Sequence, residues 1–257
     1  MNVKRTWYFM RRFKFDILSA AAGVLGMIFA SLPIRIVIVF VTLIFIIYLR
    51  SRERSFFFNA FDKFQQTDKW IGHGEFRYDA TERAFTISNI PEGIIYSEAL
   101  TWRNYRFSFE FKIINSCLGW IIRAMNPANY VMLQCGVDRI RPHIKLNGMW
   151  LIPQPHEEII FSAPLSLDNW YTAIITIHGR TARIIIRTTN EIVFDRQWQL
   201  PESGSFLVGG IPGITRRRGR PTEIRSVIPV ILDYGTIGFR NHGAERGLVR
   251  NVLVEKI

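Results

Sequence analysis

The chain has 257 residues, of which 48% are hydrophobic and 14% aromatic, and its formal net charge is +12. A composition this apolar excludes a disordered protein, and the length suffices for a membrane anchor and one domain with its own core. Residues 1–54 contain nine Lys or Arg and only two acidic residues. This uneven charge indicates membrane topology rather than a nucleic-acid partner.

The N-terminal part has the character of a membrane anchor. Residues 1–14 mix aromatic and basic side chains, as in segments at the level of lipid headgroups. Residues 15–49 are almost entirely apolar, interrupted mainly by Pro33 and Arg35. One helix over this stretch would exceed a hydrocarbon core of about 30 Å, and Pro33 disfavours a helix interior. We therefore predict a transmembrane hairpin of two spans, residues 15–32 and 34–49.

Basic residues precede the first span and follow the second, so the positive-inside rule predicts that both chain ends are cytoplasmic, in a bacterial inner membrane. The alternative is a single span at residues 34–49, extended upstream, which would export the rest of the chain. The first span contains Ala22, Gly26 and Ala30 at four-residue spacing. Small residues at this spacing allow close helix packing, against the second span or another membrane protein.

After a linker at residues 50–64, the apolar pattern changes to a period of two, which predicts a β domain over residues 65–257. The clearest strand is 105–113, where aromatic residues alternate with polar ones. The pair Asn147-Gly148 predicts a tight hairpin. Further short strands are predicted at residues 75–78, 85–88, 93–96, 119–124, 130–135, 139–146, 158–162, 170–177, 181–188, 190–195, 236–240 and 248–257. This succession is typical of an all-β antiparallel sandwich.

Three blocks of the domain share a pattern with a known superfamily. They are GWIIRAMNPANYVML at 119–133, NWYTAIITIHG at 169–179 with 192–195, and GTIGFR at 235–240 with 250–254. In this order they resemble the concanavalin A-like jelly-roll superfamily, in its laminin-G-like and family 16-like branch. The resemblance covers residues 56–257 and implies a jelly-roll β-sandwich. It concerns the framework, so it indicates the fold and says little about function.

The residues of an enzyme are missing from this pattern. Family 16 glycosidases need carboxylates at alternate positions of one strand, with nucleophile and acid about 5 Å apart. No E-x-D-x-x-E run occurs, and Glu110 stands alone among Arg, Ser and Lys. Neither a nucleophile motif, a phosphate loop nor a Cys/His cluster at zinc spacing is present. We predict no enzyme and no cofactor. Lectin-like members of the superfamily often hold Ca²⁺, which is possible here but unsupported, because Asp138, Asp168 and Asp233 show no ligand spacing.

Two sets of side chains are candidates for binding. The first is an arginine-rich loop that is suited to anionic headgroups or an acidic protein, and it lacks the interleaved aromatic residues of nucleic-acid sites. Its members are Arg216, Arg217, Arg218, Arg220 and Arg225. The second set consists of Trp120 and Trp150, which are weak candidates for stacking on a sugar; tryptophan is also common in the core or rim of such sandwiches, and packing is the favoured interpretation. The two cysteines, Cys117 and Cys135, fit either one disulfide or two buried thiols.

These observations support three hypotheses. The first is a non-enzymatic, membrane-anchored sandwich on the cytoplasmic side, which contacts membrane lipids and other membrane protein subunits as a docking or scaffolding subunit of a complex. The alternative is an exported, single-span module that binds carbohydrate. The third is a variant glycoside hydrolase, which would need paired carboxylates in a cleft.

Overall fold

The computed structural model describes residues 37, 39–45, 56–59, 69–98, 100–154, 157–207 and 225–257. The chain divides into two compact units, Met1–Phe56 and Phe57–Ile257. In the first unit, residues 37 and 39–45 are helical. No helix within the described ranges is both long and apolar enough to cross a membrane. Most of the predicted two-span hairpin, the basic-aromatic segment and the linker lie outside the described residues.

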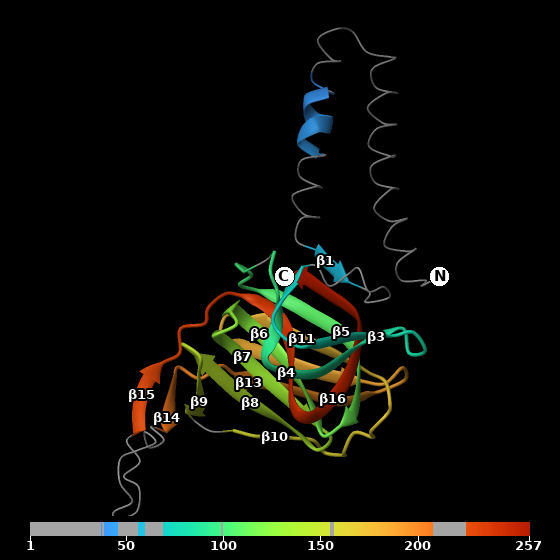
Figure 1. Cartoon of the computed structure of the whole chain (residues 1–257). Helices are drawn as coiled ribbons and strands as arrows, with labels where there is room; N and C mark the ends of the chain where they lie inside the picture. Colours follow the sequence, from blue (N-terminus) through green and yellow to red (C-terminus); the bar gives the residue numbers. More distant parts are fainter. Residues whose placement is uncertain are drawn as a thin grey trace, which may run out of the picture. The chain divides into compact units, whose positions relative to one another are not determined.

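Antiparallel strands make up most of the described residues (Figure 1). They are β1 (Phe56–Asn59), β2 (Trp70–Ile71), β3 (Glu75–Asp79), β4 (Ala84–Tyr96), β5 (Tyr105–Asn115), β6 (Cys117–Asn126), β7 (Asn129–Gly136), β8 (Arg139–Leu146), β9 (Met149–Gln154), β10 (Ile159–Ile160), β11 (Tyr171–His178), β12 (Thr181–Arg187), β13 (Ile192–Gln199), β14 (Ser203–Leu207), β15 (Arg225–Pro229) and β16 (Thr236–Lys256).

The long strand β16, drawn in red in Figure 1, belongs to both layers of the domain. Its first part, residues 236–240, pairs with β6, and its second part, residues 246–256, pairs with β5. One layer therefore runs β16-β6-β7-β8-β9-β14-β15 and the other runs β16-β5-β11-β12-β13, while β4 pairs with both parts of β16. This arrangement confirms the expected antiparallel β-sandwich.

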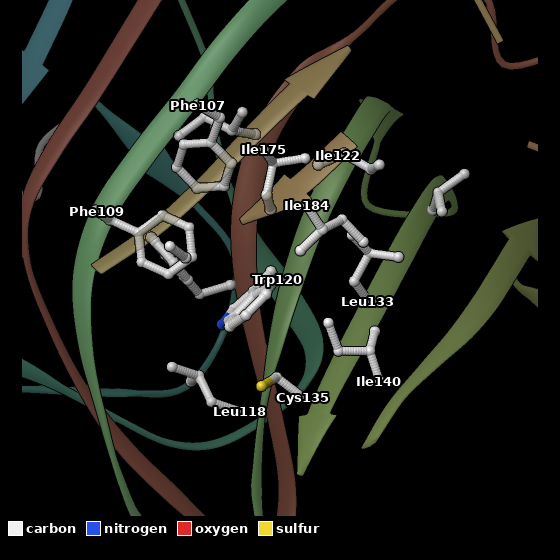
Figure 2. Packing of buried hydrophobic residues seen from close by; sticks show 14 of the residues in the cluster. Phe107, Phe109, Leu118, Trp120, Ile122, Leu133, Cys135, Ile140, Ile175 and Ile184 are labelled. Carbon is white, nitrogen blue, oxygen red and sulfur yellow. The ribbon is translucent and has the colours of Figure 1, made fainter. Parts of the chain in front are cut away.

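The two layers enclose one large hydrophobic core. On β5, the aromatic residues from Tyr105 to Phe111 are at most 1% exposed, whereas the residues between them are more accessible. Figure 2 shows Phe107 and Phe109 of one layer facing Trp120 of the other. The ring centroids of Phe109 and Trp120 are 5.3 Å apart. Burial of each such side chain contributes roughly 1.5–3 kcal/mol, so the alternation in the sequence specifies which face of β5 is internal.

Two pairs of predicted strands are each continuous. Residues 85–88 and 93–96 both belong to β4, and residues 236–240 and 248–257 both belong to β16 apart from Ile257. The register between the two strands shifts around the buried Asn241. The side-chain Nδ2 of Asn241 donates to Ile87 O at 2.8 Å, and the side-chain Oδ1 accepts from Gly119 N at 3.3 Å. These bonds satisfy backbone groups at the irregularity, so the strands bend without ending.

The hairpin predicted at Asn147-Gly148 is confirmed. Both residues have positive φ values, 50° and 79°, as a type I′ turn requires. Leu146 pairs with Met149 across the turn. Both cysteines are free and buried, which agrees with the buried-thiol alternative.

Candidate functional site

The most distinctive surface begins on β8. Its sequence alternates residues that face the core with basic residues that face away from it. Those facing the core are Ile140, Pro142, Ile144 and Leu146, and those facing away are Arg139, Arg141, His143 and Lys145. Because side chains alternate along a strand, the basic residues form one row on the outer face of this layer.

The β8–β9 hairpin places Trp150 directly opposite Lys145. The Trp150 side chain is partly exposed, at 38% for the residue. Its ring centroid lies 5.7 Å from that of Tyr130 and 6.0 Å from that of His143, both approximately edge-to-face. The Lys145 Nζ lies 5.6 Å from the Trp150 ring centre and 5.5 Å from that of Tyr130, within range of a cation–π contact.

Arg240 contacts the same tryptophan across the outer face of the layer, from a distant strand. Its strand, β16, is four strands away from β9, or roughly 19 Å in a flat sheet. Nevertheless, the guanidinium carbon of Arg240 is 4.9 Å from the Trp150 ring centre. The layer must therefore curl toward this side, with the two side chains meeting above the intervening strands. We call this surface the Trp150 face. It comprises Tyr130, Met132, Gln134, His143, Lys145, Trp150 and Arg240.

The floor of the Trp150 face is apolar and buried. Tyr130 is 0% exposed and Met132 is 1% exposed, although both point away from the main core. They form a separate small cluster with Ile95, Ile121 and Ala124. Arg240 Nη1 lies 3.7 Å from the Met132 sulfur, so the arginine covers part of this cluster. Gly119 leaves room for the arrangement, because a Cβ there would come within 2.8 Å of the same sulfur.

The irregular part of β4 fixes the charged groups around this floor. The Lys145 ammonium donates a hydrogen bond to the Glu92 carboxylate, and Arg240 Nε donates to Pro91 O at 2.8 Å. The Tyr130 hydroxyl donates to Glu92 O at 3.0 Å. The Lys145 hydrogen bond lowers the pKa of the Glu92 carboxyl, and the Lys145 and Arg240 charges add to this effect. Burial raises the pKa of Tyr130, which stays a neutral donor.

Further polar groups continue along the face. A ring nitrogen of His143, Nε2, lies 3.2 Å from Gln134 Oε1, and Gln134 Nε2 donates to Glu245 Oε1 at 2.8 Å. Arg141 Nε donates to Glu158 Oε1 at 2.9 Å. The face thus combines one accessible indole with an ordered set of donors and acceptors.

A second aromatic and cationic cluster lies on the other layer, around Trp170. The Arg250 guanidinium carbon is 3.8 Å from the Trp170 ring centre. The indole Nε1 donates to Glu82 Oε2 at 3.0 Å, and Lys112 Nζ donates to Glu82 Oε1 at 2.7 Å. Arg250 Nε donates to Glu110 Oε2 at 2.8 Å. Here the described charges are matched, so this cluster is explained by packing of the fold.

The two tryptophans predicted to stack on a sugar have opposite fates. Trp150 lies on the surface just described. Trp120 is 0% exposed and packs edge-on against Phe109 and Phe111 in the core, so the prediction for Trp120 is wrong (Figure 2). Its strand alternation explains the outcome, because Leu118, Trp120 and Ile122 all face inward.

Other predicted residues are outside what the structure describes. These are the helix-packing residues Ala22, Gly26 and Ala30 and the loop residues Arg216, Arg217, Arg218 and Arg220. Arg225 begins β15, but its side chain is not among the described ones. Within the described ranges, no group of three or more His, Cys, Asp or Glu side chains is placed to hold a metal ion.

Sequence reasoning missed the residues around Trp150. Lys145 and His143 had a usable signal, the basic alternation of residues 139–146. No local pattern pointed to Arg240 or Glu92, because their positions depend on the pairing of β16 with β4, two strands that are far apart in the sequence.

No protein-family model matches this sequence, and no curated protein matches it either. Solved structures do resemble the fold. A protein of unknown function with a galectin-like fold from Bacillus subtilis is 11% identical, with 78% of this chain and 94% of that chain covered and a TM-score of 0.50. This likeness supports a galectin-like β-sandwich and shows the fold alone.

Two further solved structures were matched. A carbohydrate-binding module from Bacillus subtilis is 12% identical, covering 73% of this chain and 96% of its own, with a TM-score of 0.45. A galectin from Caenorhabditis elegans is 11% identical, covering 67% and 95%, with a TM-score of 0.37.

Proposed function

We propose that the β-sandwich is a non-catalytic carbohydrate-binding module and that a sugar binds on the Trp150 face. The observation that carries this proposal is the exposed part of the Trp150 indole beside the fixed polar groups of Arg240, Lys145 and His143. A sugar ring has apolar C–H faces and a rim of hydroxyls. An aromatic platform bordered by donors and acceptors matches both parts of that chemistry.

The arrangement of the face supports binding because its polar groups are held before any ligand arrives. Lys145 is fixed by Glu92, and Arg240 is fixed by Pro91 O and by the indole. Side chains that are already ordered lose little conformational entropy on binding.

The charge state of the nearby carboxyl groups supports a role without catalysis. Glycoside hydrolysis needs one carboxyl group that stays protonated because its pKa is raised. The pKa of Glu92 is instead lowered by Lys145, and that of Glu158 is lowered by Arg139 and Arg141. Both groups are therefore carboxylates at neutral pH and are suited to hydrogen bonding rather than to proton donation.

A sugar ligand fits the exported, single-span alternative better than the cytoplasmic scaffold. The contacts that the scaffold hypothesis requires, Ala22 to Ala30 and the arginine-rich loop, stay predictions. We propose accordingly that the sandwich is exposed on the side of the membrane where polysaccharides occur.

The proposal is tested by a glycan array followed by calorimetric titration of the sugars that bind. Replacing Trp150→Ala should weaken binding about 10-fold or more, since a tryptophan that a ligand covers commonly dominates the binding energy. Trp150→Phe, which keeps an aromatic platform, should retain most of the affinity. The matched control is Trp170→Ala, which removes a tryptophan from the other layer. Equal effects of the two alanine variants, or no sugar binding at all, would overturn the proposal.

A further inference from the structure

We infer that the sugar bound on the Trp150 face is acidic, a uronic acid or a similar carboxylated ring, and that Arg240 binds its carboxylate. This inference rests on the proposed function and adds the chemical class of the ligand. The argument starts from the pairing of charges on the face.

The Lys and Arg side chains on the outer side of β8 each already have a carboxylate partner. Lys145 is paired with Glu92. Arg141 is paired with Glu158 at 2.9 Å. Arg139 is paired with Asp138 at 2.6 Å and with Glu158 at 2.5 Å.

Arg240 differs from these cations. Within the described part of the chain, no carboxylate oxygen comes within the 4.0 Å that defines an ion pair with its guanidinium. Its contacts are the Pro91 carbonyl, the Met132 sulfur and the Trp150 ring. A positive charge above an apolar floor is costly to leave uncompensated, so the site favours a ligand that brings a negative charge.

The guanidinium also has donors to spare. Arginine carries five N–H groups. In Arg240, Nε is used by Pro91 O at 2.8 Å, and Nη1 makes only a long contact of 3.7 Å with sulfur. Nη2 makes no hydrogen bond to a described residue. A carboxylate accepts two parallel N–H bonds from one guanidinium, a geometry that a single sugar hydroxyl does not match.

Glu92 does not remove the need for an external anion. Its carboxylate is bound to the Lys145 ammonium, which is buried at 3% side-chain exposure. The nearby Arg240 charge contributes to the lowered pKa of Glu92 but does not form an ion pair with it. A carboxylated sugar ring on the exposed indole therefore meets Arg240 as the available cation, while His143 lies at the edge of the same indole.

The experiment compares acidic sugars with their uncharged methyl esters. The whole chain is titrated with uronic acid trisaccharides, galacturonate and glucuronate, and with their methyl esters. We expect the free acids to bind about 10- to 100-fold more tightly at low salt, as for a hydrogen bond to a charged group. The advantage should shrink as salt is added. This comparison uses the unaltered protein, so it does not depend on whether any variant folds.

Variants of Arg240 then assign the effect. Arg240→Gln should reduce the ratio of acid to ester affinity to about one; because the ratio is taken within one variant, any loss of binding common to both ligands cancels. Arg240→Lys keeps the charge without the paired N–H geometry and should retain only part of the preference. Equal affinity for acid and ester, or a preference that survives Arg240→Gln, would overturn the inference and leave carbohydrate binding standing. Absence of binding to every sugar would overturn both.

Discussion

Replacing either partner of the Lys145–Glu92 ion pair should have unequal effects on stability. The Lys145 side chain is 3% exposed, whereas the Glu92 side chain is 62% exposed. Glu92→Gln leaves a buried ammonium without its counter-charge, and we expect a loss of about 1–3 kcal/mol in the free energy of unfolding. Lys145→Met leaves a carboxylate that water can solvate and a side chain of similar shape, so we expect a loss below about 1 kcal/mol.

The measurement is urea unfolding at pH 7, followed by tryptophan fluorescence, with the wild-type chain as reference. The dependence on pH provides a second readout. The pKa of Glu92 is lowered from its ordinary value of 4.5, so the pair stabilises the fold above that pH. This contribution is lost as the pH falls through the folded-state pKa, and the difference between wild type and Glu92→Gln should then disappear. A Lys145→Met variant that is destabilised as much as Glu92→Gln would refute the reasoning.

Two other predictions concern the interior of the sandwich. Burial raises the pKa of the Cys117 thiol to about 12, with Glu245 adding to the shift, and burial also raises the pKa of Cys135 well above its ordinary value. Neither thiol should therefore react with a thiol reagent at pH 8 until urea unfolds the chain, and fast labelling of the native protein would contradict this. Gly238→Ala should lower the free energy of unfolding by about 3 kcal/mol or more, because its Cβ would collide with Ile94 O where β16 passes β4. An unchanged denaturation midpoint would contradict this prediction and show that the two strands can move apart.

Local patterns predicted much of the framework. The alternation over residues 105–113 specified both the strand and its inward face, since burying the polar set instead would expose five large apolar side chains. Asn147 and Gly148 predicted the hairpin because few other residues adopt positive φ at little cost. The breaks predicted within β4 and β16 were wrong, because Asn241 bonds the backbone of neighbouring strands at a point that no local pattern reveals.

The candidate site was harder to predict for a related reason. The sequence identified Trp150 only as a residue type that can bind sugars, and Trp120 is of the same type but faces the core. The two differ in which face of the sheet their positions along the strand direct the side chain to. Trp150 and Arg240 are ninety residues apart in the chain, and they meet only because the layer curls and β16 joins it by pairing with β6.

The double membership of β16 has a consequence for biosynthesis. This strand lies between β5 and β4 in one part and between β6 and β4 in the other. Until the ribosome has released it, neither layer has its central strand, and β5 and β6 present unpaired edges. The sandwich can therefore close only after synthesis of residues 236–256, and a partly made chain must be kept from edge-to-edge association until then.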